Sequence, residues 1–389
     1  MTAPMPLTWL PEVDEAWRSK VRDFAESSVG PRVRAMDEAA AIDPELIREL
    51  FEAGLMGVEV PEAYGGSGGD LFQVALTIEE IARLDPATAV LVDVQNALVT
   101  SALLRHGDGP ARRRHLPRLA NDTVGAYAIS ESEAGSDAFA MNTTAVADGT
   151  GYVLNGTKMW TSSAREAGLF LVFAKLADVG LTAFLVERDT AGLTVGDAIP
   201  KMGIKASSTC EVTFEDVRVG KGAVLDKPGR GEMLVAETLN IGKIGIAAQL
   251  VGLARGALEE AVGFAGRRQA FGASIGTYQG VSFPLARVAA EIESARVLLY
   301  NTTRLVQAGG SASERLRATA MAKYIASEVA ERAAAQAVET LGGRGFVPGH
   351  RAEKFYRDAK VGKIYEGTSN MQFRTIAGTF PRPAPEEGA

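Results

Sequence analysis

The sequence predicts an α+β protein with a helical N-terminal domain, an antiparallel β middle domain and a C-terminal four-helix bundle. Three observations support this fold class: helix caps in the first third, short apolar runs between turn residues in the middle, and apolar residues at steps of three and four in the last third. With 389 residues, 46% of them apolar, the chain can bury a large core divided between subdomains. We place the domains at residues 1–122, 123–228 and 229–380, followed by a disordered tail at 381–389.

Helix-start signals mark the N-terminal domain. Asp43 and Pro44 supply an N-cap and a first-turn proline, an apolar stripe follows, and Gly54 ends the helix. Further helices are expected at about 70–84 and 86–106, beyond the glycine-rich loop PEAYGGSGGD, and Asp85 and Pro86 open the second of them.

Short apolar runs separated by Gly, Asn and Asp begin near Val124 and end near Gly220. They read VGAYAIS, GYVLNG, LFLVFAK, LTAFLVE, GLTVG and CEVTFEDV. Several such runs at short spacing indicate an antiparallel sheet, and we expect strands nowhere else.

The helical period returns after Gly229. Apolar residues recur at alternating steps of four and three from Val281 to Leu299, which indicates a packed helix. Alanine-rich helices at about 233–266, 280–308 and 313–341, with a shorter last helix, predict the bundle.

The composition argues against several classes of protein. The chain has 41 basic and 48 acidic residues, a net charge of −7 and no long run of one sign, so neither nucleic acid nor an anionic membrane is an expected partner. No signal peptide or uninterrupted apolar stretch of membrane-spanning length is seen, so a cytoplasmic location is expected. A single cysteine and three widely spaced histidines predict no disulfide and no metal site. Motifs for a P-loop, a Rossmann nucleotide site and a GxSxG nucleophile are absent.

Glu366, in the string IYEGTSN, is the best candidate for a catalytic residue. A glutamate in a small-residue loop is usually a solvated surface group, so the string alone is a weak signal. Two other small-residue segments, AGSD at 134–137 and KMWTSS at 158–163, can approach a flat cofactor and donate backbone N–H groups. Each is also compatible with a plain turn.

Seven ordered motifs decide between these interpretations. They are LMGVEVPEAYGGSGG, YAISESEAGSD, GYVLNGTKMW, KMGIKASSTCEVTFEDV, IGIAAQLVGLARGAL, RRQAFG and IYEGTSN. Together they resemble the acyl-CoA dehydrogenase family from about Phe24 to Ala377. Within it the chain is most similar to the short/branched-chain enzymes, in MDEAAAI, MAKYIASEVA, Asn370 and Glu339.

The resemblance implies a homotetramer, a dimer of dimers, that binds FAD at subunit contacts. The residues implied to line the flavin are Tyr127, Ile129, Ser130, Gly135, Ser136, Trp160, Thr161 and Ser162, with Ser162 near N5. Those implied to reach the pyrophosphate and adenosine of a neighbouring subunit's FAD are Arg268, Phe271, Gln279, Glu339, Gly342, Gly343, Thr368, Ser369 and Asn370.

The resemblance also implies a reaction. Glu366 matches the general base that removes the α-proton of an acyl-CoA thioester while flavin N5 accepts the β-hydride, and burial is expected to raise its pKa. The thioester oxygen is expected against the N–H of Glu366 and a ribityl hydroxyl of FAD. The implied substrate-binding residues are Ser136, Asn240, Lys243, Tyr365 and Gly367. An electron-transfer flavoprotein is the expected electron acceptor.

Three departures from the family pattern lie on the substrate side. Lys243 stands where arginine is frequent, Glu232 stands where an aromatic residue is usual, and the segment 177–181 is shortened. They are compatible with drift at solvent-facing positions, or with an acyl carrier protein carrying the thioester in place of coenzyme A. An oxidase of the same fold, and a flavin-binding relative without dehydrogenase activity, are the remaining alternatives.

Overall fold

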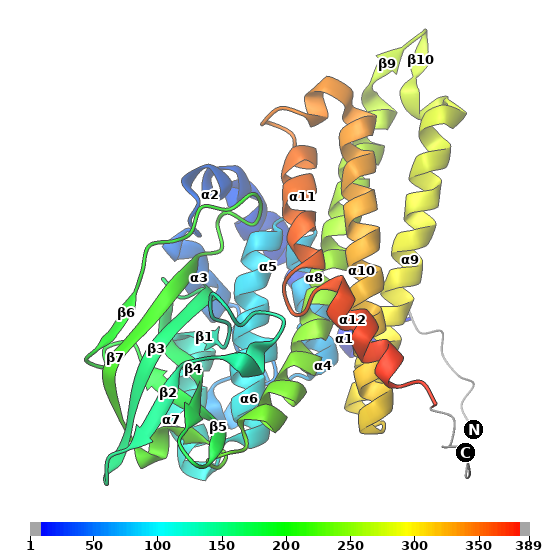
Figure 1. Cartoon of the computed structure of the whole chain (residues 1–389). Coiled ribbons are helices and arrows are strands. Elements are labelled where there is room, and N and C mark those ends of the chain that lie inside the picture. The colour runs from blue at the N-terminus through cyan, green and yellow to red at the C-terminus, as the bar shows by residue number, and fades with distance from the viewer. Residues whose placement is uncertain (1–8, 382–389) are drawn as a thin grey trace, which may run out of the picture.

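The computed structural model describes residues 9–381 as one body in which a sheet and a long helical bundle flank a layer of N-terminal helices (Figure 1). The helix α5 (Pro86–Asp93) lies between the sheet and the C-terminal helices. The predicted tail at 381–389 lies outside the described residues except for Pro381.

The N-terminal helices begin at the predicted caps. Asp43 accepts a hydrogen bond from the N–H of Glu45, and Asp85 accepts one from Thr88, so the helix starts read from the sequence are confirmed. The bounds of the remaining helices in this domain are α1 (Glu12–Phe24), α2 (Val33–Ala39), α3 (Pro44–Glu52), α4 (Leu71–Ala82), α6 (Ser101–His106) and α7 (Gly109–Asn121).

The helix predicted at 86–106 is continuous but contains a π-helical segment, η4 (Val94–Thr100), between α5 and α6. Such segments widen a helix locally and are frequent at functional sites. Within η4, the side chain of Gln95 accepts from the N–H of Gly125 at 2.7 Å and donates to the carbonyl of Leu119 at 2.6 Å. These bonds join η4 to the first strand of the sheet, so the π-helical segment fixes where that strand begins.

The middle domain is an eight-stranded sheet with the order β6-β7-β3-β2-β4-β5-β8, and β1 pairs with β4 off this path. Its strands are β1 (Val124–Ala128), β2 (Thr144–Ala147), β3 (Gly151–Ser162), β4 (Ala167–Leu176), β5 (Gly180–Glu187), β6 (Leu193–Val195), β7 (Thr209–Gly220) and β8 (Val224–Leu225). The prediction of an antiparallel sheet is wrong for two of its strand pairs, because both β1 and β2 run parallel to β4. The strand runs themselves carry no information on this pairing, since the intervening chain decides the direction in which each strand returns.

A second, two-stranded sheet lies outside the middle domain, which contradicts the prediction that strands occur only there. It consists of β9 (Gln269–Ala270) and β10 (Ala273–Ser274), joined by Phe271 and Gly272 at φ +53° and +84°. Positive φ at both turn positions is what a tight hairpin requires. Two-residue strands are too short to leave a periodic signal in the sequence.

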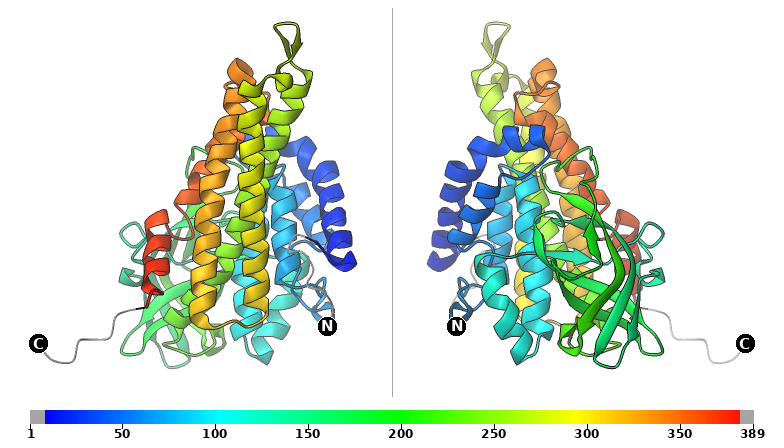
Figure 2. Two further views of the ribbon diagram at one scale, coloured as in Figure 1. Left: turned by 90° about the vertical axis from the view of Figure 1, so that its right-hand side faces the viewer. Right: turned by 90° about the vertical axis from the view of Figure 1, so that its left-hand side faces the viewer.

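The C-terminal helices form the predicted bundle. Their bounds are α8 (Gly231–Arg267), α9 (Gln279–Gln307), α10 (Ala312–Leu341), α11 (Arg351–Ala359) and α12 (Ser369–Gly378), so the shorter last helix is divided in two. In the left view of Figure 2, α9 and α10 stand side by side in front of α8. The stripe predicted on α9 faces this packing, because Leu285, Ile292 and Leu299 are buried.

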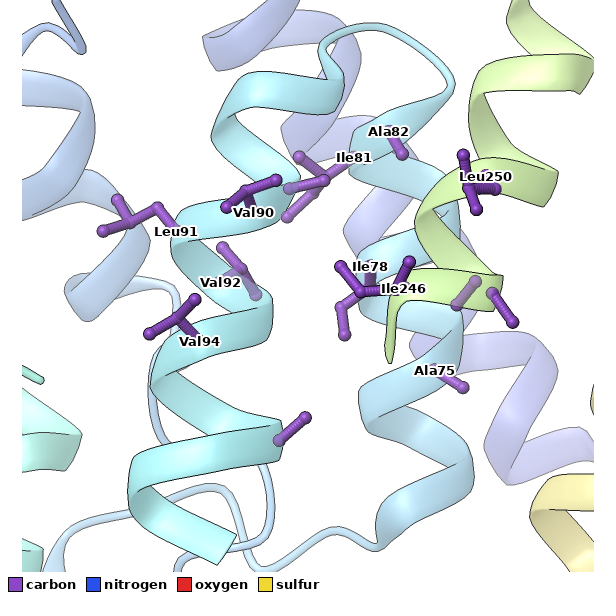
Figure 3. Packing of buried hydrophobic residues seen from close by; sticks show 14 of the residues in the cluster. Ala75, Ile78, Ile81, Ala82, Val90, Leu91, Val92, Val94, Ile246 and Leu250 are labelled. Carbon is purple, nitrogen blue, oxygen red and sulfur yellow. The ribbon is translucent and has the colours of Figure 1, made fainter. Parts of the chain in front are cut away.

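The core between the N- and C-terminal domains depends on close helix packing. Ile78 of α4 lies beside Ile246 of α8, and the valines of α5 face the same layer (Figure 3). A Cβ atom at Gly252 of α8 would lie 2.2 Å from the carbonyl oxygen of Glu79, so only glycine lets the two backbones come this close.

Two helical stretches in the described part of the chain, Pro86–His106 and Gly231–Arg267, are long and apolar enough to cross a membrane by length and composition. Their most apolar windows are 94% and 78% buried inside the protein. Buried core helices have the same composition, so the two stretches are weak evidence for membrane insertion.

Candidate active site

A cavity of about 570 Å³ opens between the sheet, the helix that contains η4 and the loop before α12. Four groups of residues supply most of its lining: Val90, Asp93, Val94 and Leu98 from α5 and η4; Tyr127, Ile129, Ser130, Gly135 and Ser136 from β1 and the following loop; Met159, Trp160 and Ser162 from β3; and Ile364, Tyr365, Glu366, Gly367 and Thr368 from the loop before α12. Segments far apart in the sequence therefore meet at one place.

The loop that carries Glu366 adopts an unusual backbone conformation. Glu366 and Gly367 have φ values of +52° and +87°, and the first is rare for a residue with a side chain. Gln372 donates to the carbonyls of Glu366 and Gly367 at 3.1 and 2.9 Å, and Lys323 donates to Gly367 at 2.7 Å. These bonds hold the left-handed turn, and strain maintained in this way is typical of functional sites.

The carboxylate of Glu366 faces the cavity without a partner in the described part of the chain. Its Oε2 atom is buried and accepts no hydrogen bond. Burial raises the pKa of Glu366 to about 7, while the charges of Lys243 and Lys323 act in the opposite direction. A carboxylate with a pKa near neutrality is suited to accept a proton from a weak acid.

Both lysines near Glu366 are buried, with Lys323 fully inaccessible and Lys243 only 8% exposed. The interpretation of Lys243 as a solvent-facing position is therefore wrong. Burial lowers the pKa of Lys323 to about 8 and also lowers that of Lys243, and the charge of Glu366 opposes both shifts. Lys243 donates to Oδ1 of Asn240 at 3.2 Å. Neither of these two predicted substrate-binding residues lines the cavity.

Trp160 forms part of the opposite wall. Its side chain is 54% exposed and its φ is +62°, at an irregularity in the pairing of β3 with β7. The neighbouring Thr161 is buried and does not line the cavity. Of the residues predicted at the flavin, Thr161 is the one that the cavity lining omits.

The loop that contains Ser130 and Ser136 is anchored by a buried ion pair. Glu131 accepts from Lys158 at 2.9 Å and from the backbone N–H of Thr143 at 2.9 Å. Burial alone raises the pKa of Glu131, but these bonds and those of Asn142 outweigh it and lower the pKa to about 2. Lys158 also donates to the carbonyl of Ile129 at 3.0 Å, so this lysine ties the cavity wall to β3.

A second group of predicted cofactor residues lies away from the cavity. Arg268, Phe271 and Gln279 are exposed around the β9–β10 hairpin, and Glu339, Gly342 and Gly343 are exposed at the end of α10. Figure 1 shows both segments at the same end of the bundle. Ser369 and Asn370 begin α12 and do not line the cavity either, whereas Thr368 does.

Sequence reasoning missed four residues that shape the site: Asp93 in the cavity wall, Lys158 behind it, and Lys323 and Gln249 beneath the Glu366 loop. Gln249 accepts from the hydroxyl of Tyr365 at 2.5 Å and donates to the carbonyl of Pro86 at 3.1 Å. The available signal was a polar residue within an otherwise apolar stretch, as for Asp93 and Gln249. Within residues 9–381, no group of three or more metal-ligating side chains is assembled.

Comparison with known proteins identifies the family. Models of the acyl-CoA dehydrogenase N-terminal, middle and C-terminal domains match residues 11–123, 126–217 and 229–379. A probable short/branched chain specific acyl-CoA dehydrogenase from Dictyostelium discoideum is 44% identical over 378 residues, which are 96% of this chain and 91% of that protein.

Solved structures show the same fold. Butyryl-CoA dehydrogenase from Megasphaera elsdenii has a TM-score of 0.92 and 34% identity, with 95% of this chain and 98% of that chain covered. The prolyl acyl carrier protein oxidase AnaB has a TM-score of 0.90 and 27% identity, with 95% of this chain and 99% of that chain covered. The predicted α+β fold class is confirmed, and the chain belongs to the acyl-CoA dehydrogenase family, whose members are FAD-dependent oxidoreductases that act on CH–CH bonds.

Proposed function

We propose that this protein introduces an α,β double bond into a short or branched acyl-CoA thioester, with Glu366 as the general base. The observation that supports this most directly is the unpartnered, buried Oε2 of Glu366 in the wall of the cavity. A buried oxygen atom without a hydrogen bond destabilises the folded protein. Its presence in the cavity wall therefore favours a role in which Glu366 accepts a proton from a substrate.

The cavity residues fit a flavin. Trp160 is left half-exposed beside Ser162 in the wall of the cavity of about 570 Å³, and an exposed aromatic face can pack against a flat ring system. In our proposal, Tyr127, Ile129, Ser130, Ser136 and Trp160 hold the isoalloxazine, with Ser162 near its N5 edge. FAD, when bound, would accept the β-hydride of the substrate.

The chain's own residues would position the thioester and move the α-proton. Glu366 would remove the proton, and its backbone N–H would donate to the thioester oxygen, where negative charge develops. Lys243 and Lys323 favour the ionised form of Glu366, and Asn240 holds the ammonium of Lys243. Tyr365, Gly367 and Ser136 would complete the substrate site.

The exposed residues at the end of the bundle support assembly with a second copy. Phe271 is 97% exposed at the tip of the β9–β10 hairpin, which is unusual for a phenylalanine on a free surface. We propose that Arg268, Phe271, Gln279, Glu339, Gly342 and Gly343, with Thr368, Ser369 and Asn370, contact the FAD of a neighbouring subunit in a homotetramer. An electron-transfer flavoprotein would then reoxidise the flavin.

A second candidate function is oxidation of an acyl group on a carrier protein. It is favoured by the likeness to the prolyl acyl carrier protein oxidase AnaB. Turnover on matched acyl-CoA and acyl-carrier-protein substrates, with oxygen consumption and reduction of an electron-transfer flavoprotein recorded in parallel, separates the two.

The central experiment replaces Glu366 by glutamine, which keeps the shape and removes the base. The FAD-loaded Glu366→Gln protein should bind butanoyl-CoA but reduce its flavin about 10²- to 10⁴-fold more slowly than the parent under anaerobic conditions. Glu211→Gln, at an exposed position of β7, is the matched control, and its flavin should be reduced (bleached) by the substrate at the rate of the parent protein. Rapid flavin reduction in the Glu366→Gln protein would contradict the assignment of Glu366 as the general base.

A further inference from the structure

Asp93 is a cavity residue with no role in the proposed reaction. It ends α5, is 1% exposed and lines the cavity beside Val90 and Val94. Its Oδ1 atom is buried and has no hydrogen-bond partner in the described part of the chain. A buried carboxyl oxygen without a hydrogen bond is destabilising, so Asp93 would be stabilised by a polar group that enters the cavity.

The position of Asp93 relative to Glu366 is fixed by two glycines of α8. A Cβ atom at Gly242 would lie 2.8 Å from Oε2 of Glu366, and one at Gly245 would lie 1.7 Å from Oδ1 of Asp93. Positions three residues apart on an α-helix are separated by about 4.5 Å along its axis. The two carboxyl groups therefore contact α8 at positions about 4.5 Å apart along its axis, a length that a short acyl chain spans.

The surroundings of Asp93 favour its neutral form. Burial raises its pKa well above the ordinary value, and the negative charge of Glu366 acts in the same direction. The hydroxyl of Tyr365, which lines the same cavity, is already donated to Gln249. In this protonated form Asp93 presents a carboxylic acid, which can donate one hydrogen bond and accept another.

We propose that Asp93 forms a subsite for an oxygen substituent on the γ-carbon of the acyl group, so that the preferred substrates are γ-oxygenated short acyl-CoA thioesters. This inference rests on the proposed function, because Glu366 must mark the position of the α-carbon. A hydroxyl or ether oxygen beyond the β-carbon would accept the proton of Asp93, while the aliphatic side chains around it contact the carbon chain.

Isosteric ligands test this subsite by binding rather than turnover. Pentanoyl-CoA, 4-hydroxybutanoyl-CoA and 4-aminobutanoyl-CoA differ only in a methyl, hydroxyl or ammonium group at the same chain position. Hexanoyl-CoA and 4-methoxybutanoyl-CoA form a second pair, in which the ether only accepts. Their dissociation constants are measured by calorimetry on the FAD-loaded Glu366→Gln protein, which removes catalysis from the measurement.

We expect the hydroxyl and ether ligands to bind about tenfold more tightly than their hydrocarbon partners, the effect of one hydrogen bond to a buried group. Adding Asp93→Leu should reverse this preference. Adding Asp93→Asn should keep it, because the amide donates without charge, and a purely structural role for Asp93 predicts no such rescue. Equal or tighter binding of pentanoyl-CoA, or tightest binding of 4-aminobutanoyl-CoA, would overturn the subsite.

Failure of the subsite is distinguishable from failure of the proposed function. If pentanoyl-CoA bleaches the parent enzyme but no oxygen preference is found, the proposed function stands and the subsite falls. If no acyl-CoA binds to or bleaches the parent enzyme, both are wrong.

Discussion

Gly242 of α8 lies directly against the carboxylate of Glu366, although 124 positions separate them in the chain. A Cβ atom at Gly242 would come within 2.8 Å of Oε2 and within 2.7 Å of Leu98 in η4. The helix surface at this point therefore sets how far the side chain of Glu366 can withdraw from the cavity.

The first prediction follows from this contact. Gly242→Ala should lower the rate of flavin reduction by about tenfold or more, because misplacing a reacting group by a fraction of an ångström removes the productive geometry. FAD content should be retained, since Gly242 does not line the cavity. The control is Gly263→Ala on the same helix, where the nearest atom to the new Cβ is the tip of Arg267 at 3.4 Å. Equal rates in the two variants would contradict the role of Gly242.

The second prediction concerns pH. Because burial raises the pKa of Glu366 to about 7 and the base must be ionised, the rate of anaerobic flavin reduction should rise as pH increases through about 7 and then level off. Lys243→Met removes a charge that lowers this pKa, so the rising limb should move to higher pH.

The rate of flavin reduction is measured by stopped-flow absorbance over a range of pH. The control is Lys221→Met, because Lys221 is exposed and does not line the cavity. A Lys243→Met profile that superimposes on that of the parent would show that this cation does not act on Glu366.

Local signals explain why much of the fold was predictable. Asp43 and Asp85 cap the helices that follow them, and the strand runs are short, apolar and bounded by turn residues. The sheet's pairing was not predictable, because β1 and β4 pair across a segment that contains two other strands. The π-helical segment η4 was also missed, since its residues are as compatible with an α-helix.

The residues of the candidate site also differ in whether the sequence could predict them. Glu366 and the cavity residues on β1 and β3 belong to continuous motifs, so a resemblance could transfer them. Asp93 and Lys323 act through contacts with segments distant in sequence, and only packing brings them beside the Glu366 loop. Lys243 was misjudged as solvent-facing because the sequence gives no direct measure of burial.

The third prediction concerns the ion pair behind the cavity wall. Glu131→Gln should destabilise the protein by about 3–5 kcal/mol, because it leaves Lys158 charged and buried without its partner. Glu131→Gln combined with Lys158→Met should recover part of this loss. Denaturant unfolding of the FAD-loaded proteins measures both, and a double variant less stable than Glu131→Gln alone would contradict the pairing.

The same pair predicts an acid limit to stability. The pKa of Glu131 is lowered from 4.5 to about 2, so its contribution is complete above about pH 4.5 and is lost as pH falls toward about 2. Comparing the unfolding midpoints of the parent and Glu131→Gln across this window checks the sign: the difference between them should shrink as the pH falls.

The fourth prediction tests the proposed contact between subunits. Phe271 makes an edge-on contact with Tyr278 at a ring separation of 6.5 Å but is otherwise exposed, so Phe271→Asp should leave the fold of the subunit intact. If the hairpin tip enters a neighbouring copy, the variant should show a smaller mass by light scattering and a lower ratio of flavin to protein absorbance after gel filtration. Val13→Asp, an equivalent change at an exposed position of α1, should alter neither. A Phe271→Asp protein that keeps the parent's mass and full flavin content would place the subunit contact elsewhere, because a buried aspartate at an apolar interface is strongly unfavourable.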